Sequence, residues 1–257
     1  MDLHTILLLF GTGIVGGVMA SLVGGASVIT FPVMLATGLS PVVATASNLV
    51  AVSPGNFFAA MADRGQLPAF DRGFVGLLTA SVLGALIGAM LLMITPVRLF
   101  EVLIPLLLGF ATVLFACSGR ITRYLRERAA ARGGRAPQMS VTSIPVLLPV
   151  SVYGGYFGAG VGVLLLGVLS VATGGDYRSA NVAKNLVSSL NTLVASICFI
   201  ANGAVSWPPT LAMMAGCVIG GLCGAHIARV IPQEAMRIVV VVVGAVLTIV
   251  FAWRYWF

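Results

Sequence analysis

Charged side chains are scarce in this sequence. Only 8% of its 257 residues are Asp, Glu, Lys or Arg, whereas 59% are hydrophobic. A soluble domain carries about a quarter charged residues, so this composition excludes a solvated globular surface. The apolar runs are long and continuous, and about 20 apolar residues cross a bilayer as a helix, whereas a β-barrel would show short alternating strands. The sequence therefore predicts an all-α polytopic membrane protein.

Acidic residues are scarcer still, with seven Asp and Glu against 14 Lys and Arg. Glu101 lies about one turn into a predicted span, and the others that flank spans lie in loops or at span ends: Asp63, Asp71, Asp176 and Glu234. None of these carboxylates lies clearly in the middle of a predicted span, so the sequence offers no carboxylate chain for a proton relay. A cation site would likewise lack the charged oxygen ligands that it needs. An interior poor in acids favours anions.

Sequence motifs for catalysis and cofactors are absent as well. The chain has no G-x-x-x-x-G-K-[ST], no H-E-x-x-H and no G-x-S-x-G, which argues against an ATPase, a zinc protease or a serine hydrolase. Four cysteines lie inside apolar segments without metal-ligand spacing, and we expect them to be unpaired, buried thiols: Cys117, Cys198, Cys217 and Cys223. We therefore expect no enzyme, no cofactor and no metal.

An internal duplication organises what is present. Ala36-Thr37-Gly38 recurs in the second half as Ala172-Thr173-Gly174, and the stripe Ala80, Gly84, Gly88 recurs at the same offset as Gly216, Gly220, Gly224. Asn48-Leu49-Val50 recurs as Asn185-Leu186-Val187, shifted by a single inserted position. Small-residue stripes of this kind permit close helix contact. Two matched halves are typical of transporters whose site lies between repeats.

Each half follows one plan. A long apolar segment interrupted by glycines (3–38 and 141–173) is followed by a polar-striped helix (41–62 and 178–202) and by two further spans. Gly16-Gly17 and Gly24-Gly25 interrupt the first segment, so we expect a broken or re-entrant helix pair there. The predicted organisation is repeat 1 over 1–118, a basic linker over 119–138 and repeat 2 over 139–257.

Basic residues predict the orientation. Six arginines between 120 and 135 account for much of the net charge of +7, which indicates a cytoplasmic linker rather than a nucleic-acid site. Attachment of the linker to anionic lipid head groups is compatible with this. If 141–173 is a re-entrant pair, the later basic residues except Arg254 lie towards the inside. Applied to both halves, this arrangement predicts inverted repeats with both termini outside.

Several motifs resemble one known family. They are Asn181-Val182-Ala183-Lys184-Asn185, Gly203-Ala204-Val205-Ser206-Trp207 and Gly220-Gly221 with Gly224-Ala225. Over nearly the whole chain the sequence resembles the TauE/SafE sulfite exporter family, also called the toluene sulfonate uptake permease family. In the first half the family's glycine triplet appears as Gly24-Gly25-Ala26-Ser27, so Ser27 can add a hydroxyl donor. The resemblance implies an inner-membrane carrier of sulfite, sulfonates or related sulfur-containing anions.

The glycine ladders are the first candidate binding groups. A helix that starts in mid-membrane leaves about four N–H groups unpaired and carries roughly half a positive charge, and glycine lets an anion approach closely. Close helix packing is the alternative role for these glycines. The candidate residues are Gly24, Gly25, Ala26 and Ser27 in the first half and Gly158, Gly160 and Gly162 in the second.

Polar side chains on the following helices are the second group. The candidates are Thr45, Ser47 and Asn48 in the first half and Lys184, Asn185 and Ser188 in the second. In lipid such groups must face protein or water, so the stripe either lines a pathway or joins helices. Lys184 is the only lysine; it either lines the pathway or extends to the membrane interface.

The sequence thus predicts a bacterial inner-membrane secondary transporter that exports small sulfur-containing anions, such as sulfite or the organosulfonate sulfoacetate. The expected partners are that anion and the lipid bilayer, and no nucleic acid is expected. The sequence does not decide whether the protein forms a homo-oligomer. An importer or channel for another small anion is the main alternative, and an intramembrane enzyme is a weaker one.

Overall fold

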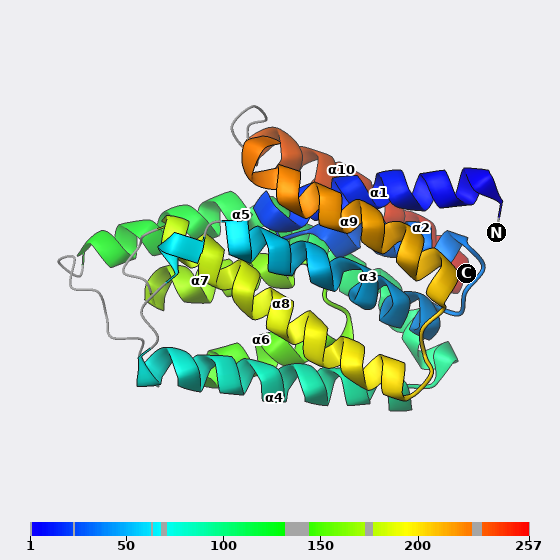
Figure 1. The fold of residues 1–257 in the computed structure, drawn as a ribbon, viewed down its shortest axis with the longest axis horizontal. Coiled ribbons are helices and arrows are strands. Elements are labelled where there is room, and N and C mark those ends of the chain that lie inside the picture. Colours follow the sequence, from blue (N-terminus) through cyan, green and yellow to red (C-terminus); the bar gives the residue numbers. More distant parts are fainter. Residues whose placement is uncertain are drawn as a thin grey trace.

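A computed structural model describes residues 2–22, 24–62, 64–67, 71–131, 144–172, 177–227 and 233–256. Ten α-helices and one short 3-10 helix make up this part of the chain, which contains no strand (Figure 1). The helices are α1 (Leu3–Leu22), α2 (Ala26–Ala36), α3 (Pro41–Ala62), α4 (Arg72–Ile94), α5 (Val97–Ala131), α6 (Ile144–Tyr156), α7 (Val161–Ala172), α8 (Tyr177–Ala201), α9 (Trp207–Ile227) and α10 (Gln233–Trp256). The all-α prediction is confirmed.

Seven of these helices are long and apolar enough to cross a membrane. The exceptions are α2, α6 and α7, which have 11, 13 and 12 residues and are shorter than the roughly 20 residues that a span needs. Each half therefore contains one interrupted pair, α1–α2 or α6–α7, at the place where the sequence predicted it. The chain is a multi-pass membrane protein.

One detail of the first pair differs from the prediction. Gly16 and Gly17 do not interrupt α1, which runs unbroken from Leu3 to Leu22. A Cβ on Gly17 would lie 2.3 Å from the backbone oxygen of Cys217, so this glycine lets α1 approach α9. Close packing outweighs the weak helix propensity of glycine here, and the chain breaks only near Gly24 and Gly25.

Glycine stripes set the main helix contacts. Gly84 and Gly88 of α4 face the backbone of α6, where added Cβ atoms would lie 2.8 Å from Leu148 O and 2.0 Å from Val152 O. Gly216 and Gly220 of α9 face α1 in the same way, and each added Cβ would lie 2.1 Å from a backbone oxygen of Phe10 or Ile14. The predicted tight contacts are confirmed, and their partners are the first helices of the opposite repeats.

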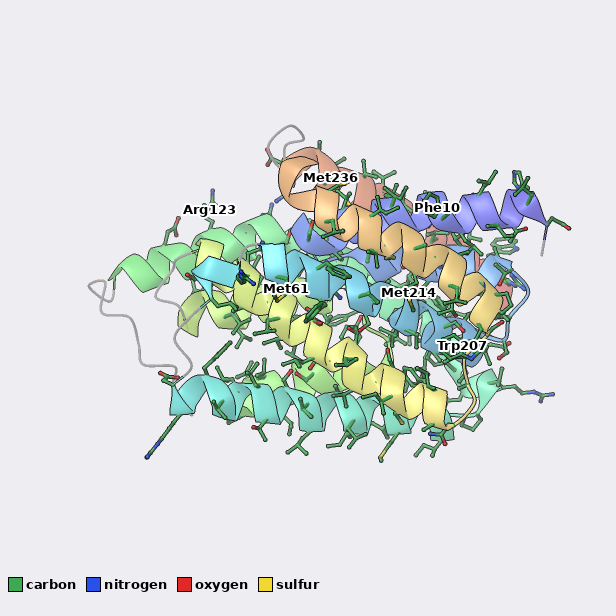
Figure 2. All side chains as sticks on the ribbon, viewed as in Figure 1. Phe10, Met61, Arg123, Trp207, Met214 and Met236 are labelled. Carbon is green, nitrogen blue, oxygen red and sulfur yellow. The ribbon has the colours of Figure 1, made fainter. Side chains whose placement is uncertain are left out.

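Helix pairing follows a two-fold pattern. Helix α1 packs on α9 as α6 packs on α4, α3 pairs with α8, and α5 pairs with α10. The start of α1 and the end of α10 lie at one end of the molecule, and the C-terminal part of α5 lies at the other (Figure 1). Arg123 and Trp207 are labelled near these opposite ends in Figure 2. This pairing is compatible with the predicted repeats, whose inverted orientation stays a prediction.

The four cysteines correct another expectation. All are free thiols, as predicted, but only Cys217 is buried; Cys117 and Cys198 are partly exposed and Cys223 is exposed. Helices that face lipid expose apolar side chains along their length. A cysteine within an apolar run can therefore face either the lipid or the protein interior, and the sequence does not distinguish the two.

Candidate functional site

The two chain breaks meet inside the molecule. A Cβ added to Gly24 would lie 2.6 Å from the Cα of Gly162, and one added to Gly162 would lie 2.5 Å from the Cα of Gly24. Only glycine permits backbones to approach this closely. Gly24 and Gly160, which occupy equivalent positions of the two repeats, also share a left-handed backbone with φ of +80° and +78°, a conformation that other residues rarely adopt.

Aromatic packing holds the breaks in place. Phe157 in the second break makes an edge contact with Phe31 of α2, with ring centroids 5.2 Å apart. Phe115 of α5 is fully buried, and Cβ atoms added to Gly25 and Gly160 would lie 2.5 Å and 3.6 Å from its ring. Both breaks therefore rest on the same side chain of α5.

A small cavity of about 20 Å³ lies beside the breaks. This is enough for about one water molecule and too small for an anion of four heavy atoms such as sulfite. The cavity is lined by residues of both breaks and of α1, α2, α3, α7 and α8: Ala20, Gly24, Ala26, Ser27, Leu49, Val52, Asn56, Gly158, Val161, Ser188 and Thr192. The described structure is thus a closed state.

Two helices begin at this cavity. Helix α2 starts at Ala26 after Gly25, which provides no side-chain cap, and α7 starts at Val161. The N-terminus of a helix carries a partial positive charge, although some N–H groups at these two helix starts are already paired, such as Val28 N with Gly25 O at 3.2 Å and Val163 N with Gly160 O at 3.0 Å. None of the described lining residues is charged, so these helix ends supply the local field, and that field favours an anion.

Ser27 connects the cavity to the helix behind it. Its Oγ accepts a hydrogen bond of 3.2 Å from Nδ2 of Asn48 on α3. The Oδ1 of Asn48 and the Oδ1 of Asn185, which the duplication matches to it, are both buried without a hydrogen-bond partner in the described structure. Buried polar atoms are nearly always paired, so two unpaired amide oxygens at matched positions mark this region as unusual.

Lys184 is buried, with 1% of its surface exposed. Its Nζ donates a hydrogen bond of 3.2 Å to the carbonyl of Ala20, and Nδ2 of Asn181 donates one of 3.4 Å to the carbonyl of Ser21. Both carbonyls lie in the last turn of α1, where helix carbonyls lack partners inside the helix. Helix α8 thus caps the broken end of α1, and the Lys184 side chain lies inside the protein.

The structure brings together most of the predicted site residues. Gly24, Ala26, Ser27, Gly158 and Ser188 line the cavity. Gly25 and Gly160 pack on Phe115, Gly162 contacts Gly24, and Asn48, Lys184 and Asn185 lie buried just behind the lining.

Two predicted residues lie elsewhere in the packing. Thr45 donates to Pro41 O of its own helix at 2.9 Å, and Ser47 accepts a bond of 3.0 Å from the N–H of Ser206. These contacts stabilise α3 and the start of α9. A polar stripe on a helix can serve several neighbours, so periodicity alone did not separate these residues from the lining ones.

Asn56 and Thr192 line the cavity but were not among the predicted site residues. Asn56 lies two helical repeats of four after Asn48 on α3, and Thr192 lies one such repeat after Ser188 on α8. Residues four apart share a helix face, so continuing the spacing from the predicted residues would have found both.

Comparison with known proteins agrees with this architecture. A sequence model described as "Sulfite exporter TauE/SafE" matches residues 9–251. The chain is 22% identical over 250 residues to a "Probable membrane transporter protein" of Haemophilus influenzae, covering 96% of this chain and 94% of that protein. It is 25% identical over 252 residues to the "Probable membrane transporter protein ORF9" of Sinorhizobium sp, covering 96% and 92%.

The "Probable membrane transporter protein YfcA" of Escherichia coli K12 is 22% identical over 246 residues, with 93% of this chain and 87% of that protein covered. No solved structure matches the chain. Since the family match spans nearly the whole sequence and the fold has seven candidate membrane spans, this multi-pass bacterial membrane protein belongs to the TauE/SafE sulfite exporter family of transporters.

Proposed function

We propose that the protein is a secondary carrier that moves a small sulfur-containing anion, such as sulfite or an organosulfonate, outward across the inner membrane. The observation that carries this proposal is the meeting of the two breaks, where α2 and α7 begin beside one uncharged, partly polar cavity. Two helix N-termini that converge on one point suit a compact anion, and the family description supplies the sulfur chemistry.

The transport site would open by separation of the breaks. The cavity of about 20 Å³ must enlarge before an anion of sulfite's size can enter. The contact between Gly24 and Gly162 joins one broken pair to the other, so parting there would admit the anion between the repeats. A closed cavity supports a carrier with alternating access rather than an open channel.

Asparagine amides would supply further donors. Rotating the Asn48 amide by half a turn would let the Ser27 hydroxyl donate to Oδ1 and would free Nδ2 for the anion, because amide orientation is interchangeable in such a pair. The unpaired amide oxygen of Asn185 suggests the same exchange in the second repeat. A protonated Lys184 behind the lining would add attraction.

Inverted repeats fit the same proposal. With the basic end of α5 in the cytoplasm, one broken pair would enter from each side of the membrane. Outward movement of each negative charge along an inside-negative potential is favourable by about 2.3 kcal/mol per 100 mV, so export needs no coupling ion. Import of another small anion is the second candidate, since the same groups would bind it.

Counterflow in proteoliposomes tests the proposal. Vesicles loaded with unlabelled sulfite, sulfoacetate or phosphate receive external labelled sulfite, and empty vesicles provide the background. We expect sulfite and sulfoacetate, but not phosphate, to drive accumulation of unchanged labelled sulfite. Exchange of none of the sulfur anions would refute the proposed substrate class, and chemical alteration of the sulfite would indicate an enzyme.

A further inference from the structure

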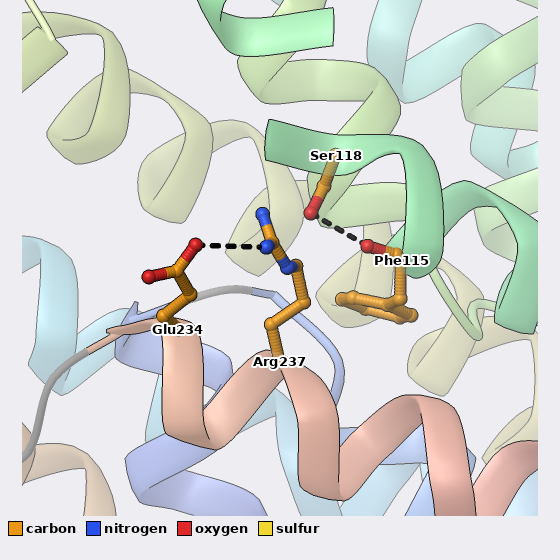
Figure 3. Close-up of polar contacts among 4 residues, drawn as sticks. All are labelled: Phe115, Ser118, Glu234 and Arg237. Atoms are coloured by element: carbon orange, nitrogen blue, oxygen red, sulfur yellow. Dashed lines mark hydrogen bonds and ion pairs between the residues drawn. The ribbon is translucent and has the colours of Figure 1, made fainter. Parts of the chain in front are cut away.

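A second, much larger cavity lies between α5 and α10, near the basic end of the molecule. Its volume is about 560 Å³, and the described residues that line it are Ala116, Cys117, Gly119, Arg120, Arg123, Glu234 and Arg237. Figure 3 shows Arg237 extending from α10 towards α5, beside Ser118 and next to Glu234. This basic cleft shares no lining residue with the central cavity.

The basic cleft carries excess positive charge. Its three arginines face one carboxylate, Glu234, which pairs with Arg237 at 3.2 Å. Arg123 makes a loose, exposed pair with Glu127 at 3.8 Å. Arg120 forms no ion pair with any described residue. The cleft therefore favours an anion, and guanidinium groups suit phosphate in particular.

Gly119 positions one of these guanidinium groups. A Cβ at this residue would lie 2.0 Å from Nη1 of Arg237. The absence of a side chain thus lets the Arg237 guanidinium lie against the backbone of α5. Its side chain is only 26% exposed, so the group is held by the protein, unlike an arginine that extends freely into solvent.

The depth of the basic cleft indicates where its anion comes from. The candidate span on α5 ends at Arg120, and the one on α10 begins at Glu234. The arginines therefore lie at the ends of the two candidate spans, which is where lipid phosphates are expected. Ile238 and Val113, which follow along the two helices into the span, are 58% and 60% exposed and could contact acyl chains.

The equivalent positions at the other end of the molecule carry different residues. The offset between the repeats relates Gly119 to Tyr255 and Arg237 to Glu101. There Trp256 donates from Nε1 to Val102 O at 3.1 Å, and Tyr255 stacks on Phe251 with ring centroids 5.9 Å apart. Aromatic residues and an acid thus replace the glycine and the arginine, so the arrangement of Gly119 and Arg237 is not repeated at the other end of the α5–α10 pair.

We propose that the basic cleft binds the phosphate head group of an anionic phospholipid from the cytoplasmic leaflet, with Arg120 and Arg237 holding the phosphate. A volume of about 560 Å³ exceeds what a phosphate alone needs and suits a head group with its glycerol. Basic pockets between transmembrane helices bind anionic lipid head groups in this way. The lipid would join α5 to α10 and so link the two repeats.

Lipid binding to the purified full-length protein tests this proposal without measuring transport, so its outcome is separate from that of the proposed function. Native mass spectrometry in detergent would follow titration with phosphatidylglycerol, phosphatidylcholine or inorganic phosphate. We expect phosphatidylglycerol alone to bind at low micromolar concentrations. Arg120→Gln should weaken it about fivefold, and Arg120→Gln with Arg237→Gln about 25-fold.

Arg254→Gln at the opposite end is the matched control and should leave lipid binding unchanged. Arg120 is exposed and forms no ion pair with the described residues, so its single variant should fold even if the double variant does not. Equal affinity of wild type and Arg120→Gln would overturn the proposal, as would equal binding of phosphatidylcholine. Binding of inorganic phosphate as tight as that of phosphatidylglycerol would overturn the lipid source.

Discussion

We propose two physical roles for Lys184 at the residue scale. Its side chain is buried and caps the carbonyl of Ala20 at the end of α1, and Ala20 itself lines the central cavity. A buried amine near a closed, acid-free cavity can stabilise both the broken helix and an incoming anion. These roles are separable, because Asn181 performs the first without bringing a charge.

Lys184→Met should lower the apparent affinity for the anion about fivefold to thirtyfold. An attraction of about 4 kcal/mol at 4 Å and an effective dielectric near 20 is partly cancelled by desolvation, which leaves about 1–2 kcal/mol. Asn181→Leu, which removes the other cap of α1, is the control. If both variants change sulfite counterflow equally, capping alone explains Lys184, and the proposed electrostatic role is wrong.

Asn48→Asp should reduce transport at least tenfold while preserving side-chain shape. The new carboxylate would lie behind Ser27, within one hydrogen bond of the cavity, where repulsion of an anion is worth a few kcal/mol at an effective dielectric near 20. Asn202→Asp in the exposed turn after α8 provides the control for an added charge. Counterflow rates of the two variants decide the matter; equal rates would contradict an anion beside Ser27.

At the element scale, glycine has different uses that sequence alone could not separate. The breaks near Gly24 and at Gly158–Gly160 were predicted, and so was the tight packing of the Gly84 and Gly220 stripes. The same reasoning wrongly expected an interruption at Gly16-Gly17, where glycine serves contact with α9 and α2. The low helix propensity of glycine shows that a break is possible at such a position. Whether the glycine breaks the helix or lets another helix pack closely depends on the neighbouring backbone.

Gly220→Ala should destabilise the protein by about 1–3 kcal/mol, the usual range for overpacking. Its Cβ would lie 2.1 Å from Ile14 O, so α1 and α9 would have to separate. Gly11→Ala on α1 is the matched control, because nothing lies within 4 Å of its added Cβ, and it should be neutral or stabilising by up to about 1 kcal/mol. Thermal unfolding in detergent compares them, and equal midpoints would show that this contact is loose.

The starts of helices were easier to predict from the sequence than their ends. Helix α3 begins at Pro41, where the sequence predicted a helix over 41–62, and α4 begins after Asp71, whose carboxylate accepts from Phe74 N at 2.7 Å. Helix α5, in contrast, continues to Ala131, well past the apolar span that was expected to end near 118. Arginine and glutamate are good helix formers, so the end of hydropathy did not mark the end of the helix.

At the scale of the whole molecule, the duplicated sequence indicated the two-fold packing pattern. It did not indicate the contact between Gly24 and Gly162. The offset between the repeats pairs Gly24 with Gly160 instead. The site is formed by contact between non-equivalent positions of two repeats. A one-dimensional repeat can locate the broken segments and cannot say which of their atoms touch.

The orientation of the molecule gives a further prediction. Both termini should face the periplasm and the basic end of α5 the cytoplasm, as the positive-inside bias requires. Single cysteines at residues 2 and 257 in a cysteine-free background should react with a membrane-impermeant maleimide in intact spheroplasts, whereas one at residue 135 should not. Protection of either terminus would contradict inverted repeats.

The most direct test of the central claim, an anion site where the two breaks meet, compares neighbouring serines on α8. Ser188 lines the cavity, whereas Ser189 is equally buried and does not. Sulfite counterflow should show an apparent KM raised about tenfold in Ser188→Ala, because a hydrogen bond to a charged group is worth about 1.5–3 kcal/mol, and an unchanged KM in Ser189→Ala. Equal KM values for wild type and Ser188→Ala, or an equal rise in both variants, would contradict the site.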